Sequence, residues 1–304
     1  MPSSLISICI PCYNSDVTAL CKNLVEQIKK DALEIEIVVL DDASKDEFKA
    51  LNKDIVDFSP LRYIALEENI GRARIRNAFL KYSQAEYLLF VDGDSAVPSN
   101  FLKKYSEYLQ NQSRVDVLVG ASVYQNHPPE LAYRLRWKYS RKRESLSFSQ
   151  RISAQNGGFK SNNFLIRKDV FAQILFNEKI LGYGHEDTLF GHDLIKNNIS
   201  ISHIDNPVVN IHLDSNEVFL EKTKNAVRNS VAIYEMLENS SDWVKSQKLL
   251  SIFLRLNKSP FGRLLLKVNF LNRTWYLDLL KSGRAPLFVF DLYRLALMFE
   301  VKTL

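Results

Sequence analysis

The chain has 304 residues, of which 46% are apolar and 25% are charged. This composition excludes wholesale disorder and suffices for one large domain, with or without an extension. The net charge of +5 is uneven, because residues 245–304 carry eleven Lys and Arg against three Asp and Glu, a net +8 that leaves −3 for the rest.

The first half of the sequence alternates between short apolar runs and stretches of helical periodicity. The apolar runs predict strands at 5–11, 34–40, 61–66, 87–91 and 115–123. Between them, helices are expected at about 17–28, 45–57 and 71–82, with a further one from Pro98 onward. Such alternation predicts an α/β fold with a mostly parallel sheet, covered by helices on both faces.

The second half is less regular. A glycine-containing loop leads into a strand at 156–167, and a loop at 182–185 leads into a helix with Leu189, Phe190 and Leu194 facing inward. Short strands are expected at 201–205 and 208–212, and the chain is helical from residue 215 onward. We therefore predict a catalytic domain at 1–214 and a basic helical extension at 215–304.

Three cysteines lie near the start of the chain, at positions 9, 12 and 21. Cys9 and Cys12 have the spacing of a redox or zinc motif, but Cys9 lies inside an apolar run and no second cysteine pair follows. Buried reduced thiols are the better interpretation. The sequence has no run of 18 apolar residues and no basic region at its start, so we expect neither a membrane-spanning helix nor a secretory signal.

Polar residues follow three of the predicted strands. PCYN comes after the first strand, DDAS after the second and DGDS after the fourth. In open parallel sheets, ligands bind beyond the carboxyl ends of the strands. The sequence therefore predicts that these three strand ends form one site.

Asp92 and Asp94 close the fourth strand with one glycine between them. Two carboxylates this close repel each other, and burial raises the pKa of at least one of them. A divalent cation would remove the conflict, and carboxylate oxygens suit Mg²⁺ or Mn²⁺ better than zinc. The alternative is a solvated turn, since Asp-Gly pairs favour turns.

Five motifs occur in a set order: IPCYN, VVLDDAS, NIGRARIRNA, FVDGDS and GHED. Together they resemble the inverting glycosyltransferases of family 2, which have the GT-A fold, over about residues 5–213. The resemblance implies a nucleotide-sugar donor, an acceptor hydroxyl on a glycan or a lipid-linked glycan, and Mn²⁺ or Mg²⁺ as cofactor.

The resemblance also implies roles for single residues on the donor side. Pro11, Tyr13 and Asn14 match the loop that flanks the base, although a simple turn explains them as well. Asp42 matches the residue that accepts a hydrogen bond from the N3–H of the base, which favours a UDP-sugar. Arg76 matches the NxGxxxxRN pattern and would reach a phosphate, and Gly158 belongs to the loop that borders the donor sugar.

Further residues are assigned to the metal and to the reaction by the same resemblance. Asp92 would face the nucleoside and share in metal binding, Asp94 would bind the metal, and His212 would complete the metal shell. Asp187 of GHED would be the catalytic base, and Glu186 would orient the acceptor. The structural alternative for Glu186 and Asp187 is a helix N-terminus enriched in acids, and both interpretations hold together.

A catalytic base in this reaction has to act in the transition state. An alcohol has a pKa of about 16 and an aspartic acid of about 4, so complete proton transfer in the ground state would cost roughly 16 kcal/mol. The proton must therefore move late, as the new C–O bond forms, to a carboxylate that contacts the acceptor oxygen.

Two further features bear on the partners. The QxxRW pattern of processive family members does not follow Asp187, so we expect one sugar to be moved per encounter, as in the assembly of surface polysaccharides. The basic extension, rich in Leu, Phe and Trp, either lies on an anionic membrane or packs on the catalytic domain with a basic outer face. We expect a cytoplasmic protein, either free or peripheral on the inner face of the plasma membrane, and no nucleic-acid partner.

Two other functions remain open from the residues alone. One is a nucleotide-sugar-binding scaffold without catalysis, which the intact DGD and ED argue against. The other is a phosphohydrolase of the haloacid dehalogenase type, but its DxDx[TV] motif follows the first strand, whereas here DGDS follows the fourth and ends in Ser95.

Overall fold

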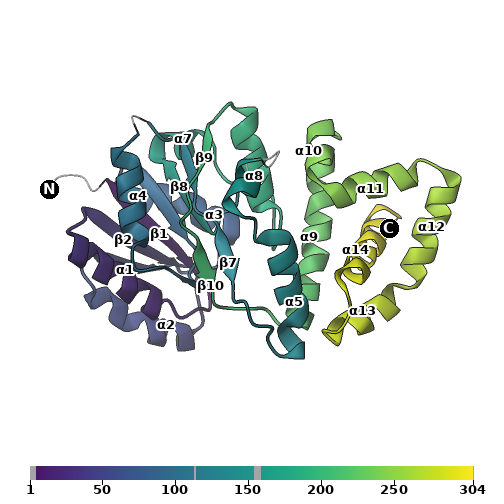
Figure 1. Ribbon diagram of the computed structural model, residues 1–304, viewed down its shortest axis with the longest axis horizontal. Coiled ribbons are helices and arrows are strands. Elements are labelled where there is room, and N and C mark those ends of the chain that lie inside the picture. Colours follow the sequence, from purple (N-terminus) through teal and green to yellow (C-terminus); the bar gives the residue numbers. More distant parts are fainter. Residues whose placement is uncertain (1–4, 113, 154–158, 304) are drawn as a thin grey trace. The chain divides into compact units, whose positions relative to one another are not determined.

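The structure is a computed structural model that describes residues 5–112, 114–153 and 159–303 (Figure 1). The chain separates into two compact units, and each is described by itself. The first consists of Met1–Gln125, Ser145–Glu178 and Asp187–His212, and the second of Asn126–Glu144, Lys179–Glu186 and Leu213–Leu304. The predicted domain boundary at residue 214 stays a prediction.

The first unit is built on a seven-stranded sheet with the order β3-β2-β1-β4-β8-β6-β9. These strands are β1 (Ile6–Cys12), β2 (Ile35–Asp41), β3 (Leu61–Ala65), β4 (Tyr87–Val91), β6 (Val117–Val119), β8 (Asn163–Arg167) and β9 (Ile201–His203). All neighbours pair in parallel except β8, which is antiparallel to both β4 and β6. The predicted mostly parallel α/β fold is confirmed.

A second sheet has the order β5-β10-β7 and consists of β5 (Ser95–Ala96), β7 (Ser122–Tyr124) and β10 (Val208–Asn210). The single strand predicted at 115–123 is wrong, because it divides between the two sheets at Gly120. A Cβ at Gly120 would lie 2.3 Å from Oη of Tyr105 and 2.5 Å from Nδ2 of Asn163. Ala121 then takes a left-handed φ of 70°, which turns the chain into the second sheet.

Helices cover both faces of the large sheet. They are α1 (Thr18–Asp31), α2 (Asp46–Asn52), α3 (Arg72–Tyr82), α4 (Phe101–Gln110), α6 (Phe148–Ile152), α7 (Lys168–Gln173) and α8 (Glu186–Lys196). Alternate strand residues separate two cores: Ile8 packs with residues of α1 and α4, whereas Cys9 packs with residues of α3, α7 and α8. Each fully buried aliphatic or aromatic side chain contributes about 1.5–3 kcal/mol to stability.

The helix boundaries follow local chemistry. The N-cap residue of α1 is Val17, which has no side-chain capping hydrogen bond, and the preceding Asp16 accepts a hydrogen bond from the N–H of Thr18 at 2.9 Å. The helix expected at 45–57 instead ends as a 3₁₀-helix, η1 (Lys53–Asp57). The helix expected at Pro98 begins three residues later, at Phe101.

The second unit is helical. It contains η2 (Leu131–Tyr133), α5 (Arg134–Tyr139), the π-helical η3 (Ser140–Glu144), α9 (Asn216–Met236), α10 (Ser241–Ser246), α11 (Lys248–Asn257), α12 (Pro260–Leu271), α13 (Arg273–Lys281) and α14 (Leu287–Thr303). The rings of Tyr139, Phe219 and Phe290 pack together in its core. Within the described residues, no helix combines the length and the apolar character needed to cross a bilayer.

Candidate active site

The loops that follow β1 and β2 are joined by backbone hydrogen bonds. The N–H of Asp42 donates to the carbonyl of Cys12 at 2.8 Å, and the N–H of Asn14 donates to Oγ of Ser44 at 2.8 Å. Asn14 takes a left-handed φ of 48°, and the side chain of Tyr13 is 55% exposed. The fold thus brings the first two predicted strand ends together and leaves an aromatic face open to solvent.

The carboxylate of Asp42 holds the loop that opens α3. It accepts hydrogen bonds from the N–H of Ile70 at 2.7 Å and of Gly71 at 3.0 Å, and Asn69 donates to its backbone carbonyl at 3.0 Å. Burial raises the pKa of Asp42, and the two backbone N–H groups partly offset this. The contact between Asp42 and a base stays a prediction.

The turn Asp92-Gly93-Asp94 packs against the loop after β1. A Cβ at Gly93 would lie 2.9 Å from Cγ1 of Val17 and 3.4 Å from the carbonyl oxygen of Pro11. Glycine is therefore required here by close approach. The convergence of the first and fourth strand ends, inferred from the sequence, is present in the structure.

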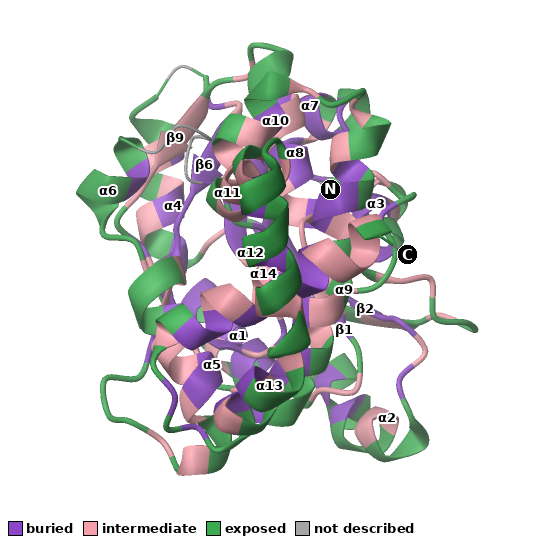
Figure 2. Cartoon of the chain, turned by 90° about the vertical axis from the view of Figure 1, so that its right-hand side faces the viewer, coloured by how far each residue is buried: buried purple, intermediate pink, exposed green. Residues whose placement is uncertain are grey.

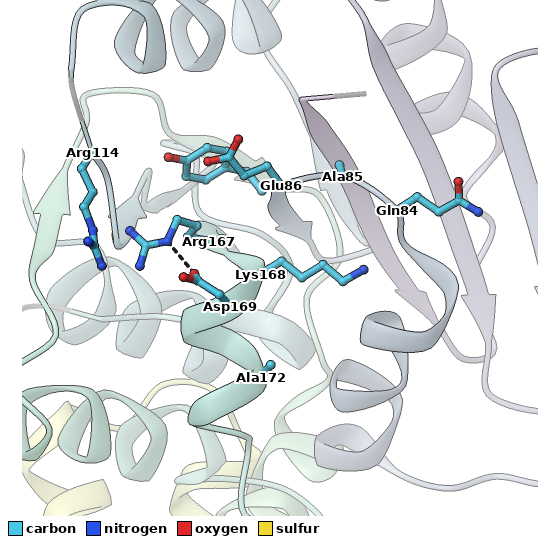
Figure 3. Close-up of a pocket in the computed structure, with 9 residues that line it drawn as sticks. Gln84, Ala85, Glu86, Arg114, Arg167, Lys168, Asp169 and Ala172 are labelled. Atoms are coloured by element: carbon cyan, nitrogen blue, oxygen red, sulfur yellow. Dashed lines mark hydrogen bonds and ion pairs between the residues drawn. The ribbon is translucent and has the colours of Figure 1, made fainter. Parts of the chain in front are cut away.

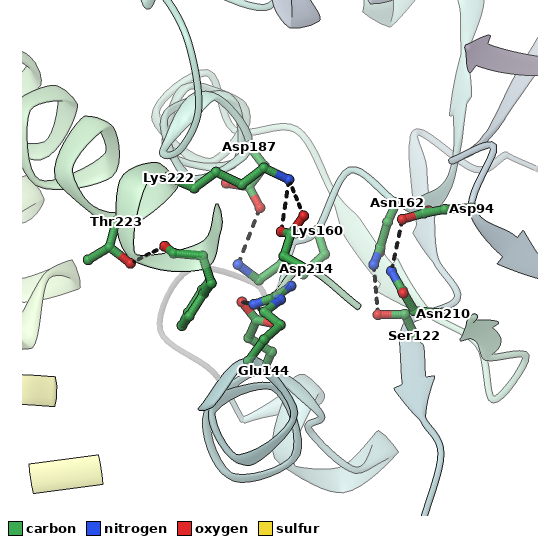
Figure 4. A network of polar contacts seen from close by, with 12 residues as sticks. Asp94, Ser122, Glu144, Lys160, Asn162, Asp187, Asn210, Asp214, Lys222 and Thr223 are labelled. Carbon is green, nitrogen blue, oxygen red and sulfur yellow. Dashed lines mark hydrogen bonds and ion pairs between the residues drawn. The ribbon is translucent and has the colours of Figure 1, made fainter. Parts of the chain in front are cut away.

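Each carboxylate of this turn has its own partner. Arg76, which is 2% exposed, donates from Nη2 to Oδ1 of Asp92 at 2.8 Å. Asn210 of β10 donates to Oδ2 of Asp94 at 3.3 Å, as Figure 4 shows. Burial, followed by the charge of Asp92, raises the pKa of Asp94, and Arg72 partly offsets this. Arg76 thus binds a carboxylate, and its predicted contact with a phosphate stays a prediction.

Asp187 lies in the first turn of α8 and is held on both carboxylate oxygens. Its Oδ1 accepts from the N–H of Thr188 at 2.7 Å, and its Oδ2 accepts from Nζ of Lys160 at 3.2 Å (Figure 4). Two residues further along the same segment, the carbonyl of Asn162 accepts from the N–H of Asp92 at 3.2 Å. Lys160 and Asn162 are two residues apart, a distance of at most about 7 Å along the chain. One short segment therefore contacts both the predicted catalytic base, Asp187, and the turn Asp92-Gly93-Asp94, which we call the acidic turn.

In the second unit, the loop before Glu186 is held by α9. Nδ2 of Asn229 donates to the carbonyls of Leu181 and Gly184, both at 3.0 Å. Gly184 has a φ of 101°, and a Cβ there would lie 2.6 Å from Cβ of Ala226. Glu186 is 5% exposed and accepts from the N–H of Gly184 at 3.0 Å.

The donor set of the acidic turn fits a divalent cation. Asp92 and Asp94 offer hard oxygen ligands, and the raised pKa of Asp94 reflects a carboxylate whose charge a cation would stabilise. The described residues contain no ready-made group of three or more His, Cys, Asp or Glu side chains for a metal, and His212 is exposed. The metal role of Asp92, Asp94 and His212 stays a prediction, and Gly158 lies outside the described residues.

Some residues of the site were not predicted from the sequence. Lys160 contacts Asp187, and Asn210 contacts Asp94. Both contacts join residues that are distant in the sequence, and neither Lys160 nor Asn210 belongs to a recognisable motif. Arg74, which lies in the third motif, forms an exposed ion pair with Glu178 at 3.4 Å.

A separate hollow of about 800 Å³ lies where β4 begins and β8 ends (Figure 3). Several of its charges are paired, since Arg167 contacts Asp169 at 2.5 Å, as Figure 3 shows, and Asp116 at 3.0 Å. The acidic turn lies at the other end of β4, so this hollow is not part of the candidate active site.

The mostly parallel sheet with an acidic turn at the end of β4 is the arrangement expected of the GT-A fold. Residues 7–175 match the family model described as glycosyl transferase family 2. The match covers more than half of the chain, and the chain belongs to this family.

Two curated relatives are staphylococcal enzymes. The chain is 26% identical over 183 residues to the teichoic acid poly(glycerol phosphate) polymerase of Staphylococcus epidermidis, which covers 59% of this chain and 24% of that protein. It is 32% identical over 116 residues to the poly(ribitol-phosphate) beta-N-acetylglucosaminyltransferase TarS of Staphylococcus aureus. This aligned region covers 37% of this chain and 20% of that protein. The chain therefore spans a quarter or less of the length of these relatives.

Solved structures share the fold. The mannosyltransferase PcManGT from Pyrobaculum calidifontis, in complex with GDP-Man and Mn²⁺, superposes with a TM-score of 0.56 at 13% identity, covering 99% of this chain and 88% of that one. S. aureus TarS 1-349 in complex with UDP superposes with a TM-score of 0.52 at 22% identity, covering 95% of this chain and 89% of that one.

Proposed function

We propose that this glycosyltransferase moves one sugar from a UDP-sugar to a hydroxyl of a glycan or lipid-linked acceptor, with inversion and with a divalent cation. The observation that carries the proposal is the segment Lys160–Asn162, which contacts both Asp187 and the backbone of Asp92. This segment connects a carboxylate suited to act as base with a turn suited to hold a cation. TarS bound to UDP and PcManGT bound to Mn²⁺ support the choice of nucleotide and metal.

The residues of the chain have separate tasks in this proposal. Asp94 and Asp92 would hold the cation, which when bound supplies positive charge to the diphosphate leaving group. Arg76 keeps the carboxylate of Asp92 in place through their 2.8 Å contact. Tyr13, exposed beside Asn14, offers its ring to the uracil ring of the donor.

Asp187 would accept the proton of the acceptor hydroxyl. Its Oδ1 is held by Thr188 at 2.7 Å, so the carboxylate is oriented before the acceptor arrives. A fixed base acts at the late stage of C–O bond formation, where proton transfer becomes favourable. Transfer of one sugar per encounter is supported by the absence of a QxxRW pattern after Asp187 in the sequence.

The test combines donor binding with turnover. UDP is titrated by calorimetry with and without Mn²⁺, and UDP release from a panel of UDP-sugars is then measured with surface-glycan fractions as acceptors. Asp187→Asn should bind UDP within about threefold of the unchanged protein and lose at least about 100-fold in turnover. Asp193→Asn, on the same helix, is the matched control and should keep its activity.

Each rival function has its own result. A scaffold would bind UDP without turnover in any variant, and a phosphohydrolase would release inorganic phosphate. Normal turnover by Asp187→Asn would reject Asp187 as the base, and UDP binding that is indifferent to Mn²⁺ and to Asp94→Asn would reject the proposed cation site.

A further inference from the structure

Helix α12 leaves an apolar face exposed to solvent (Figure 2). The side chains of this face are one, three or four residues apart in the sequence. At about 100° per residue they occupy an arc of about 120° around the helix axis. Their exposed fractions are 69% for Phe261, 57% for Leu264, 45% for Leu265, 50% for Val268 and 66% for Leu271. We call these five residues the α12 face.

The opposite side of α12 already completes the core of the second unit. Leu266 is 1% exposed, and a Cβ at Gly262 would lie 2.0 Å from the carbonyl oxygen of Leu256 in α11. Nδ2 of Asn269 donates to the carbonyl of Leu292 in α14 at 2.9 Å. The α12 face is therefore additional apolar surface that the packing of the second unit does not use.

Uncompensated positive charge surrounds this face. Between Asp242 and Asp278 the sequence has seven Lys and Arg and no Asp or Glu. Four of these cations are exposed at the end of α11 or on α12: Arg255 lies in α11, Lys258 follows α11, and Arg263 and Lys267 lie on α12. Across the part of the chain that the structure describes, none of these four is in an ion pair.

We propose that the α12 face docks on the surface of an anionic lipid bilayer. A helix of this type lies in the interface, with its apolar side chains among the upper acyl chains and its Lys and Arg side chains extended to the headgroups. Trp275, 59% exposed on the neighbouring helix α13, has the residue type that anchors proteins at this depth.

Charge favours a bilayer over a second copy of the chain. Pairing two α12 faces would bring two sets of four unpaired cations together, and like charges oppose such contact. An anionic membrane surface attracts the same cations, each by about fivefold in partitioning. The inference does not rest on the proposed donor, cation or base, because docking requires none of them.

The experiment is vesicle co-sedimentation of the full chain without nucleotide or metal. Vesicles of phosphatidylcholine with 30% phosphatidylglycerol are compared with pure phosphatidylcholine at about 0.1 M and 0.5 M salt. We expect binding to the anionic vesicles, at least tenfold weaker binding to the neutral ones, and a marked loss at high salt. Tryptophan emission should shift to the blue on binding, and Trp275→Phe should remove most of this shift.

Paired variants isolate the two contributions. Leu264→Ser with Leu271→Ser should weaken binding at least tenfold, whereas Leu51→Ser with Val56→Ser, which changes two similarly exposed residues of the first unit, should not. Lys258→Gln with Lys267→Gln should weaken binding about thirtyfold, and Lys22→Gln with Lys30→Gln should have little effect. Circular dichroism confirms that each variant is folded.

Two results would overturn the proposal. One is equal sedimentation with anionic and neutral vesicles. The other is a stable dimer in light scattering that Leu264→Ser with Leu271→Ser dissociates, together with an absence of vesicle binding, which would assign the α12 face to a second copy.

Discussion

Nζ of Lys160 lies 3.2 Å from Oδ2 of Asp187, so the residue proposed as catalytic base has a cationic neighbour from the segment before β8. The lysine side chain is 46% exposed and that of Asp187 is 20% exposed, so this contact positions the carboxylate more than it stabilises the fold. Lys160→Gln should lower kcat about tenfold and leave the donor KM within about twofold, because a misplaced base costs rate and not donor binding.

The control for this prediction is Lys103→Gln, which removes another exposed lysine that faces an acid, Glu107, at 3.8 Å. That variant should keep full activity. An unchanged kcat for Lys160→Gln would show that the ammonium group does not position Asp187.

Gly93→Ala should disturb the acidic turn through a steric clash. The new Cβ would lie 2.9 Å from Cγ1 of Val17, which is fully buried. Overpacking of this kind costs about 1–3 kcal/mol of the free energy of unfolding, and we expect UDP binding in the presence of Mn²⁺ to weaken at least tenfold. Urea unfolding and calorimetry measure the two effects.

A second substitution tests this cause. Val17→Ala removes the atom that the new methyl group would meet, so Val17→Ala combined with Gly93→Ala should recover most of the lost UDP affinity. If the double variant binds no better than Gly93→Ala, the clash with Val17 is not the reason for the loss.

Asp42→Asn should destabilise the loop before α3. The carboxylate accepts two backbone N–H groups, from Ile70 and Gly71, and an asparagine side chain has only one acceptor oxygen. One N–H would then face an amide NH₂, at a cost of about 1–3 kcal/mol in the free energy of unfolding. Chemical denaturation should detect this change, and Asp46→Asn, at an exposed position in α2, should stay within about 0.5 kcal/mol. An unaltered midpoint for Asp42→Asn would contradict the structural role given to this carboxylate.

The three thiols should be unreactive in the folded protein. Cys9, Cys12 and Cys21 are all buried free thiols, as expected from the sequence. Burial raises the pKa of Cys12 and of Cys21 to about 12, and it also raises that of Cys9. Since only the thiolate is nucleophilic, iodoacetamide at pH 8 should modify none of them in the native state and all three in guanidinium chloride.

Mass spectrometry of the alkylated protein provides the measurement. Rapid modification of native Cys12 at pH 8 would mean that the loop after β1 opens in solution and that this thiol is not held in the protonated form.

Much of the fold and part of the site could be predicted from the sequence. Continuous apolar runs such as Tyr87–Val91 identify strands that are buried on both faces, and helical periodicity placed Leu189, Phe190 and Leu194 in the core, where the structure has them. The acidic turn could be placed beside the loop after β1 because parallel neighbouring strands end at the same edge of a sheet.

The sequence by itself determined most strands and helices of the first 110 residues and the motifs that mark the family, because these depend on local pattern and spacing. Only the tertiary structure decided that the run at 115–123 divides at Gly120, that Lys160 faces Asp187, and that α12 leaves Leu264, Leu265 and Leu271 exposed while it buries Leu266. Periodicity records which residues share a side of a helix, but whether that side is covered depends on neighbours that are distant in the chain. The partner of Lys160 likewise could not be predicted, because a single lysine in a loop forms no sequence pattern.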